Sequence, residues 1–303
     1  MNLHLDGKMF DTIITQMQNE LSIHRSIIIK DYFVTLFLKT LKDYYPQYIF
    51  KGGTSLSKCF YAINRFSEDI DLSYYITAHE NITSRKIKKA NKGIKEAINH
   101  LGFIFKNEEE FKSGRKFQIF EAEFSFKEEE SVVRDHIIIE NSILTISFPV
   151  IEKNIESMIG SYLKEMDMNN LADDYELHAF SVKAQDISRT FIDKVYAICD
   201  YYLEDKAYEH SRHIYDLHML YNKIGSLDDS TELIQDVREE RKNNIKSISI
   251  LEEKNIKNLL QEIIVKNFYK LDYENITKKL VYDDTSYSQA IETLKLIAAH
   301  DCF

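Results

Sequence analysis

The chain has 303 residues, with 44% hydrophobic and 29% charged side chains and only two prolines, which is the composition of a soluble globular protein with one large or two modest domains. Its formal net charge of −10 argues against a protein that coats nucleic acids non-specifically. No apolar run could span a bilayer, no signal-peptide pattern opens the chain, and the three scattered cysteines predict neither disulfides nor a zinc site. We therefore expect a cytoplasmic protein with no membrane partner.

Apolar periodicity predicts helices and strands in alternation up to Pro149, and mainly helices after it. In the first half, helices are expected at 7–21, 26–43, 55–64 and 84–101, and extended segments at 48–51, 69–75, 102–107, 115–126 and 135–147. In the second half, one extended stretch is expected at 175–183, with helices at 188–204, 210–223, 228–243, 250–270 and 286–299. The sequence thus predicts an α+β fold, with a catalytic domain at 1–150 and a mostly helical domain at 151–303 that completes the active-site cleft.

The stretch KGGTSLSKCF predicts a turn that approaches a ligand closely. Gly52 and Gly53 lack side chains, so the backbone there can adopt unusual dihedrals, and Thr54 or Ser55 can cap the helix that follows. The unpaired N–H groups at such a helix start favour bound phosphate. Most glycine pairs only make a turn, and the spacing is not that of a P-loop, so this motif is weak on its own.

Asp69 and Asp71 alternate with Ile70 and Leu72 in an expected strand. A period of two places both carboxylates on one face, about 6.6 Å apart along the strand. That spacing suits one or two Mg²⁺ ions that also contact phosphate oxygens. Many such pairs are only solvated strand ends, but the order of strand, glycine turn, helix and carboxylate strand favours a nucleotidyltransferase site.

A basic stretch follows the carboxylate strand, with cations at Arg85, Lys86, Lys88, Lys89, Lys92 and Lys95. In one interpretation these side chains form the solvated face of a helix whose Ile87, Ile94 and Ile98 point to the core. In the other, they form a patch that binds an RNA backbone near the active site. The two interpretations are compatible.

Five blocks follow one another between Ile27 and Leu220: IIIKDYFVTLFLKTL, FKGGTSLSKCF, RFSEDIDLSY, SRTFIDKVYAICDYY and RHIYDLHML. Together they resemble the AbiEii/AbiGii toxin family of nucleotidyltransferases, from bacterial abortive-infection (phage-defence) and toxin–antitoxin systems. The resemblance implies a DNA polymerase β-like core, a mixed sheet with helices, followed by a helical C-terminal domain. It also implies Mg²⁺ or Mn²⁺ as cofactor and a nucleoside triphosphate (NTP) as substrate. Some mycobacterial relatives add nucleotides to tRNA 3′ ends, and others are described as binding GTP.

The resemblance assigns the triphosphate to the glycine motif, here Gly52, Gly53, Thr54 and Ser55. The metal-binding pair falls on Asp69 and Asp71. Polymerase β-like sites take a third carboxylate from a neighbouring strand, and we predict Glu140 as that metal ligand. Strand alternation puts Asp135 on the opposite face, and a Glu140 that merely faces solvent is the simpler alternative.

The later blocks carry three further site residues. Lys194 matches the family's lysine and would neutralise triphosphate charge as pyrophosphate leaves. Arg189 would help to bind the nucleotide, or else pair as a surface cation with Asp193 at i,i+4. Asp216 would lie close to the chemistry as a base or substrate orienter, unless it only pairs with Arg212 on its own helix.

Two more residues of these blocks would support the site. Asp31, in the first block, would brace the site from behind. His213, in the last block, would add a hydrogen bond, although a histidine that is only packed in the core fits the sequence equally well.

The resulting hypothesis is an Mg²⁺-dependent nucleotidyltransferase that transfers a nucleotide from NTP to an acceptor, with a tRNA 3′ end as the implied acceptor and a cognate antitoxin as partner. A protein hydroxyl as acceptor would leave the same catalytic signature. Two other classes stay open: a nucleotide-binding interaction module that docks an antitoxin, and a nucleotidyltransferase acting on a small molecule of antibiotic type. The complete set of Asp69, Asp71 and Lys194 argues against a degenerate binder, and the later blocks favour the toxin family over the small-molecule enzymes.

Overall fold

The computed structural model describes residues 1–75, 82–126, 128, 130–144 and 146–303, so Thr145, in the predicted extended segment 135–147, lies outside the described residues. The chain forms two compact units. The sheet unit comprises Met1–Phe50, Glu68–Ile143 and Glu152–Ala184. The helical unit comprises Lys51–Ser67, Leu144–Ile151 and Gln185–Phe303. In the described part of the chain, no helix is long and apolar enough to cross a membrane.

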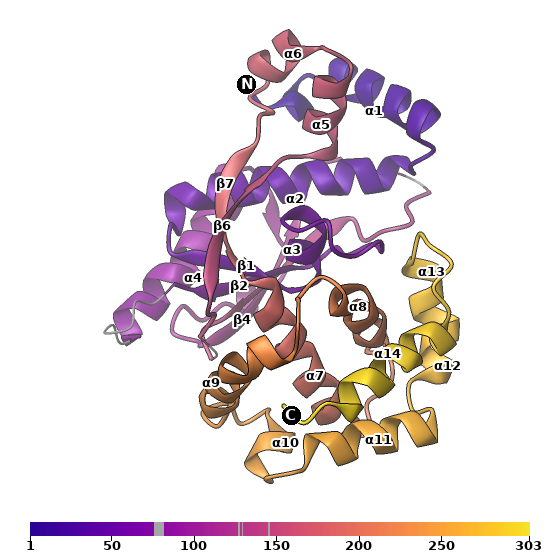
Figure 1. The fold of residues 1–303 in the computed structure, drawn as a ribbon. Coiled ribbons are helices and arrows are strands. Elements are labelled where there is room, and N and C mark those ends of the chain that lie inside the picture. The colour runs from indigo at the N-terminus through magenta and orange to yellow at the C-terminus, as the bar shows by residue number, and fades with distance from the viewer. Residues whose placement is uncertain (76–81, 127, 129, 145) are drawn as a thin grey trace. The chain divides into compact units, whose positions relative to one another are not determined.

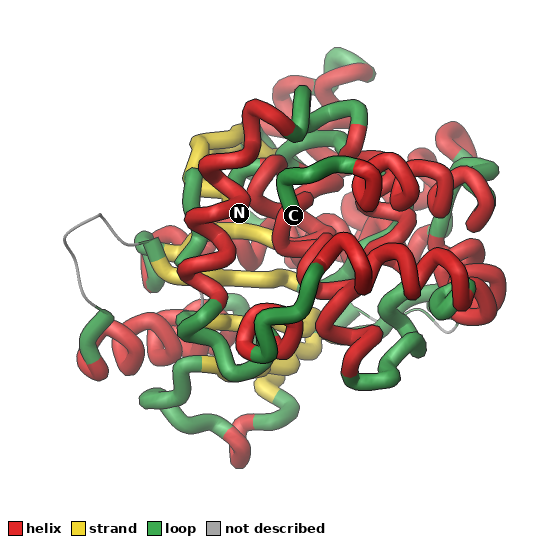
Figure 2. The backbone as a smooth tube through the Cα atoms, turned by 60° about the horizontal axis from the view of Figure 1, so that its bottom comes forward, coloured by secondary structure: helices red, strands yellow, loops and turns green. Residues whose placement is uncertain are grey.

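A seven-stranded mixed sheet organises the sheet unit, in the order β3-β4-β5-β2-β1-β7-β6 (Figure 1). Its strands are β1 Tyr48–Lys51, β2 Ile70–Tyr74, β3 Ile104–Phe105, β4 Phe117–Glu123, β5 His136–Ser142, β6 Val150–Ile155 and β7 Phe180–Gln185. The pairs β2–β5 and β1–β7 are parallel, whereas β4 is antiparallel to both β3 and β5. Figure 2 shows the strands in yellow among the helices. The α+β class that the sequence predicts is confirmed.

One face of this sheet is covered by α2 (Arg25–Tyr44) and α4 (Ser84–His100), which pack against each other. Phe33 of α2 stacks on Phe124, just after β4, with ring centroids 4.3 Å apart. Asn141 of β5 donates to Asn91 of α4 at 2.8 Å. As predicted for 84–101, α4 is amphipathic and buries Ile87, Ile94 and Ile98. The remaining helices of the sheet unit are α1 (Gly7–Leu21), α5 (Met158–Glu165), α6 (Asn169–Asp174), η1 (Leu3–Leu5) and η2 (Glu108–Glu110).

One hydrophobic core holds the helical unit together, built mainly by α7 (Ile187–Leu203), α8 (Arg212–Tyr221), α11 (Ile256–Lys266) and α14 (Tyr287–Ala299). Each of these helices contributes a fully buried aliphatic side chain, namely Val195, Leu217, Leu260 and Leu294. The other elements are α3 (Gly52–Lys58), η3 (Asp228–Ser230), α9 (Thr231–Arg241), α10 (Ile248–Leu251), α12 (Lys270–Asp272), η4 (Tyr273–Thr277) and α13 (Lys278–Leu280).

The structure departs from the sequence prediction in three places after residue 150. The helix predicted at 250–270 is interrupted, because Glu253 has a φ of 49° and Asn255 caps a new helix with its side chain. Strand β6 and helices α5 and α6 were not predicted. The apolar and polar residues of β6, Val-Ile-Glu-Lys-Asn-Ile, do not alternate, so its sequence carries no strand signal of period two. Glu152–Ala184 groups with the sheet unit, whereas the predicted domains divide near residue 150.

Candidate active site

The glycine pair lies where β1 runs directly into α3. Gly52 has a φ of +75°, a backbone conformation that side-chain-bearing residues rarely adopt. At Gly53, an added Cβ atom would lie 2.6 Å from Ser67 Oγ and 2.9 Å from Arg65 Nη2. The predicted glycine turn is therefore present, and it also allows the following segment to approach closely.

Helix α3 begins earlier and ends sooner than the predicted helix at 55–64. It starts at Gly52, and its N-cap is Lys51, which makes no capping bond through its side chain. The prediction that Thr54 or Ser55 caps the helix is wrong. Because the glycine itself opens the helical turn, both hydroxyl residues lie inside α3.

Both hydroxyls of this motif are buried and fasten the turn. Ser55 donates a hydrogen bond to the carbonyl of Gly52 at 3.0 Å, and Thr54 donates to Ser67 Oγ at 3.1 Å. A phosphate bound here would be held by main-chain N–H groups unless these hydroxyls exchange partners.

A buried ion cluster surrounds Asp216 of α8. Arg65 binds both carboxylate oxygens, with Nε 2.6 Å from Oδ1 and Nη2 2.8 Å from Oδ2. Lys194 Nζ, from α7, lies 2.7 Å from Oδ2 and 3.2 Å from His213 Nδ1. Asp216 is 0% exposed and Arg65 is 4% exposed. The structure thus brings Lys194 and Asp216 together and adds Arg65, a residue that the sequence analysis missed.

Arg65 could have been noticed as the first residue of the RFSEDIDLSY block, four positions before Asp69. Main-chain contacts join the segment 64–66 to the segment 280–282, including an antiparallel bridge between Arg65 and Val281. These contacts fix the backbone from which Arg65 reaches Asp216. They join segments far apart in the sequence, which is why local patterns did not reveal them.

The charged groups of this cluster shift one another's pKa values. Burial opposes the ionised form of Asp216, but Arg65 and Lys194 outweigh it, so the pKa of this carboxyl is lowered. Burial lowers the pKa of Lys194, although Asp216 partly restores it. Burial and the neighbouring charge of Lys194 hold the pKa of His213 well below its usual value, so its ring is neutral and accepts a hydrogen bond from Lys194. Asp216 is therefore an ionised orienting group and a weak base, and it pairs with Arg65 and Lys194 rather than with Arg212.

Arg189 belongs to a second buried ion network. Its Nε lies 3.1 Å from Asp193 Oδ2, its Nη2 lies 3.1 Å from Glu240 Oε2, and its guanidinium stacks 4.5 Å from the centre of the Phe148 ring. Asp193 also pairs with Arg241 at 3.2 Å. At 1% exposure Arg189 is not the surface cation of the simpler interpretation. Its role in nucleotide binding stays a prediction, and such a role would require these partners to be exchanged for phosphate.

In the sheet unit, strand register brings two predicted carboxylates side by side. Asp71 of β2 and Glu140 of β5 are direct partners in the parallel pair. Along β5, Glu140 is half-buried while Ile139 and Asn141 point into the core. Asp69 lies two residues before Asp71, just ahead of the first residue of β2, so the strand is shorter at this end than the predicted 69–75. The backbone thus gives Glu140 the position that a third carboxylate ligand requires, whereas ligation itself stays a prediction.

An ion network holds the segment that leads into β2. Arg134 Nη1 lies 3.2 Å from Asp69 Oδ1, and the Arg134 main-chain N–H donates to Glu68 at 3.1 Å. Lys30, which is 1% exposed, lies 3.3 Å from Glu68 Oε2 and donates to the carbonyls of Arg134 and His136. These residues fix the main chain that leads into β2 and the main chain at the start of β5.

The first sequence block contributes Lys30 rather than Asp31 to this network. Asp31 instead accepts the N–H of Met158 at 2.7 Å, at the start of α5. Neighbouring helix residues point about 100° apart, so one step along α2 decides which side chain reaches the carboxylate segment.

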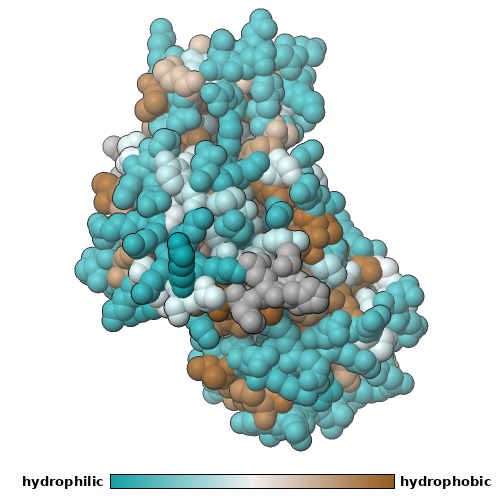
Figure 3. All heavy atoms as spheres, turned by 90° about the vertical axis from the view of Figure 1, so that its left-hand side faces the viewer, coloured by the Kyte–Doolittle hydropathy of each residue, from teal (hydrophilic) through white to brown (hydrophobic). Residues whose placement is uncertain are grey.

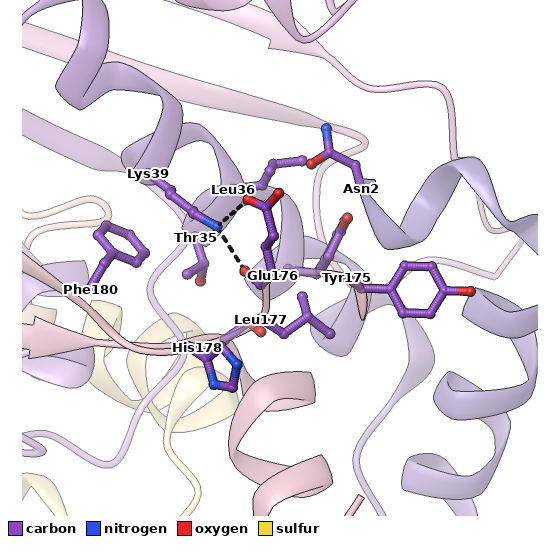
Figure 4. A pocket seen from close by; sticks show the side chains of 11 residues that line it. Asn2, Thr35, Leu36, Lys39, Tyr175, Glu176, Leu177, His178 and Phe180 are labelled. Carbon is purple, nitrogen blue, oxygen red and sulfur yellow. Dashed lines mark hydrogen bonds and ion pairs between the residues drawn. The ribbon is translucent and has the colours of Figure 1, made fainter. Parts of the chain in front are cut away.

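A recess elsewhere in the sheet unit contains none of the predicted site residues (Figure 4). It is lined by residues of α2 and of the segment 175–180, and Lys39 crosses it to pair with Glu176 at 3.2 Å and to donate to the Glu176 carbonyl at 2.8 Å. This internal pairing leaves the recess without a charged group aimed at a ligand.

Comparison with protein families decides the family. A family model described as "Nucleotidyl transferase AbiEii toxin, Type IV TA system" matches residues 36–294. The chain belongs to the AbiEii family. It is accordingly a nucleotidyltransferase toxin of a type IV toxin–antitoxin system, with an NTP as substrate and an antitoxin as partner. Every predicted AbiEii site residue, from Gly52 to Asp216, lies within the match, whereas Lys30 and Asp31 precede it.

No curated protein matches this AbiEii sequence. Two solved structures are similar to it over most of their length. JHP933 from Helicobacter pylori has 15% identity and a TM-score of 0.48, with 91% of this chain and 92% of that chain covered. MenT4, a nucleotidyltransferase toxin from Mycobacterium tuberculosis H37Rv, has 14% identity and a TM-score of 0.40, with 94% and 98% covered. Neither likeness adds to the family assignment.

The carboxylates of this AbiEii chain fit a divalent metal in chemistry and in register. Asp71 and Glu140 offer hard oxygen donors at paired positions of two adjacent strands, and Asp69 offers another just before β2. Within the described ranges, no three or more His, Cys, Asp or Glu side chains are gathered closely enough to hold an ion, and Asp69 is directed to Arg134. Binding of a metal would therefore require side-chain rotation on a backbone that already has the needed register.

Proposed function

We propose that this AbiEii chain transfers a nucleotidyl group from an NTP to a hydroxyl of an RNA acceptor, with Mg²⁺ as its metal. The observation that carries the proposal is the register of Asp71 beside Glu140, with Asp69 two residues earlier, just before β2 begins. Carboxylates on neighbouring strands supply the hard oxygen ligands that two-metal sites use in phosphoryl transfer.

Asp69, Asp71 and Glu140 would hold the metal. When bound, Mg²⁺ would lower the pKa of the attacking hydroxyl and stabilise the departing pyrophosphate. Mn²⁺, which also takes oxygen ligands, would substitute for it.

The triphosphate would be held by the glycine turn and by Lys194. Lys194 and Arg65 carry two positive charges against the single negative charge of Asp216, since His213 is neutral. The remaining positive charge suits a phosphate oxygen. Asp216, with its lowered pKa, would aim Lys194 at the triphosphate rather than accept a proton.

We take a tRNA 3′ end as the first acceptor to test. Support comes from the AbiEii assignment together with the basic exposed face of α4. In the cell, the transfer would be the toxic activity that a cognate antitoxin restrains, as part of defence against phage.

The test is incubation of the purified chain with MgCl₂, each α-labelled NTP in turn, and total tRNA. We expect labelled RNA with at least one NTP, no label in EDTA, and no label on tRNA whose terminal ribose has been oxidised with periodate. Absence of label on any acceptor with all four NTPs would contradict the proposed function. Label found only on protein would replace RNA with a protein hydroxyl as acceptor.

A further inference from the structure

The exposed face of α4 carries a row of cations. Arg85, Lys88, Lys89 and Lys92 are all exposed, and they follow the i, i+3, i+4, i+7 spacing that places residues on one side of a helix. From Arg85 to Lys92 this row extends about 10 Å along the helix axis, at ~1.5 Å per residue. The opposite side of α4 is buried in the core of the sheet unit.

A second basic segment is fastened to the same helix. The buried Asn91 of α4 donates to the carbonyls of Ser113 and Arg115, at 2.9 and 2.8 Å. A Cβ atom at Gly114 would lie 3.8 Å from Cε of Lys88. These contacts hold the segment 112–116 against α4, and its charged residues Lys112, Arg115 and Lys116 are exposed. Together with the row on α4 they form what we call the basic α4 surface.

The basic α4 surface has no counter-charges of its own. In the described part of the chain, none of these seven cations forms an ion pair, whereas several exposed lysines of the helical unit do, among them Lys242 with Glu239 at 2.6 Å, Lys254 with Glu252 at 3.2 Å and Lys295 with Glu292 at 2.7 Å. Like charges at i,i+4, such as Arg85 with Lys89 and Lys88 with Lys92, repel each other. In a chain of net charge −10, such a surface is suited to a partner that supplies repeated negative charge.

We propose that the basic α4 surface binds the phosphate backbone of the RNA acceptor. The choice of RNA rests on the proposed transfer to an RNA hydroxyl. A membrane fits less well, because the apolar side of α4 is buried and cannot enter a bilayer. Figure 3, which views the side on which α4 lies in Figure 1, shows a mainly hydrophilic face.

The test measures RNA binding without NTP or metal, by titrating total tRNA over a salt series. The surface variant replaces Lys88, Lys89 and Lys92 with Gln. Its control replaces Lys242, Lys254 and Lys295 with Gln, which changes the net charge equally at exposed but ion-paired positions. Because every substituted residue is exposed, both variants should keep the wild-type melting temperature.

If all three lysines contact phosphates, the surface variant should bind RNA roughly 50- to 150-fold more weakly near 0.15 M salt, since each contact contributes roughly four- to fivefold there. The slope of log affinity against log salt should become shallower by about 2 to 3. Lys112→Gln with Arg115→Gln should weaken binding further, and the control should bind like wild type.

Equal RNA binding by wild type and surface variant across the salt series would overturn this inference, as would an equal loss in the control. The inference would also be overturned if binding to vesicles of anionic lipid depended on these lysines while binding to RNA did not. The outcomes are separable from those of the proposed function. If the wild type labels tRNA but the surface variant binds RNA normally, only the inference about the basic α4 surface is wrong. If RNA binding depends on these lysines but no nucleotide is transferred, only the proposed reaction is wrong.

Discussion

The two units hold their charged site residues in opposite ways. In the helical unit, Asp216 is fully buried and each of its carboxylate oxygens contacts a cation. In the sheet unit, Asp71 and Glu140 are half-buried like charges placed side by side by strand register. The first arrangement is a finished set of ion pairs that contributes to folding. The second places two negative charges next to each other, an arrangement that a bound cation would favour, so we expect its residues to matter for chemistry more than for stability.

The largest expected effect comes from breaking the carboxylate set. Asp71→Ala should lower nucleotide transfer by at least about 10³-fold, because a metal ligand supplies several kcal/mol of transition-state stabilisation. Thermal unfolding should be unchanged or shifted upward, since one of two adjacent negative charges is removed. Labelled-NTP transfer and a melting curve on the same preparation measure both effects. Near-normal transfer by Asp71→Ala would show that the site assignment is wrong.

Replacing an aspartate with alanine in the helical unit should instead lower the free energy of unfolding. Asp216→Ala leaves Arg65 and Lys194 buried without their shared carboxylate, and breaking a buried ion pair in this way costs about 3–5 kcal/mol of unfolding free energy. Urea denaturation measures this cost, with Asp71→Ala as the matched control. A loss below about 1 kcal/mol would mean that the contrast between the units does not hold.

The sequence predicted the parts of this comparison that depend on local patterns. The amphipathic helix at 84–101 and the strand with Asp71 follow from periodicity, although β2 begins at Ile70 and leaves Asp69 just before it. The register places Glu140 rather than Asp135 beside Asp71, and its role as a metal ligand stays a prediction. The Asp216 cluster was only half predicted. The family resemblance supplied Lys194 and Asp216, but the contact of Arg65 with Asp216 spans 151 positions and no local pattern encodes it.

The errors of prediction also have local physical causes. Thr54 and Ser55 were expected to cap a helix that in fact starts at Gly52, where a φ of +75° lets glycine open the turn. Asp31, which was expected to brace the site, instead binds the start of α5 while its neighbour Lys30 reaches Glu68, because the phase of α2 relative to the sheet is set by tertiary packing. The sequence of β6 lacks the apolar–polar alternation that predicts a half-buried strand.

Lys194 allows the role of the buried cluster to be tested by pH. Burial lowers its pKa, so it loses its proton at a lower pH than an ordinary lysine at about 10.4. Bound triphosphate favours the charged form, so the KM for NTP should rise with pH, by about tenfold for each pH unit above the lowered pKa. Lys194→Arg, which stays charged, should flatten this rise.

Loss of folded protein cannot explain a KM that rises with pH, because Lys194 makes the folded state more stable, not less, as the pH rises. With a lowered pKa in the folded state, the unfolded chain binds more protons at Lys194 between the lowered and the usual pKa, so this residue makes stability rise with pH.

Lys194→Ala should weaken NTP binding while RNA binding stays near wild type. A rise in KM that is identical in wild type and Lys194→Arg would assign the titration to another group.

The smallest expected effect tests whether the Arg134 side chain already takes the place of a metal ion beside the carboxylates of the sheet unit. Arg134 lies 3.2 Å from Asp69 with 44% of its side chain exposed, so it competes with a metal for this carboxylate. An exposed pair of this kind is worth about 0.2–1 kcal/mol, and Arg134→Gln should therefore raise Mn²⁺ affinity by roughly 1.4- to 5-fold. Electron paramagnetic resonance of free Mn²⁺, recorded without NTP, reads this change directly. The control is Arg115→Gln, which removes an exposed cation of the sheet unit that has no ion pair among the described residues. If Arg134→Gln instead weakens Mn²⁺ binding, Arg134 holds Asp69 in the geometry of a ligand, and the sheet unit is as preorganised as the helical one.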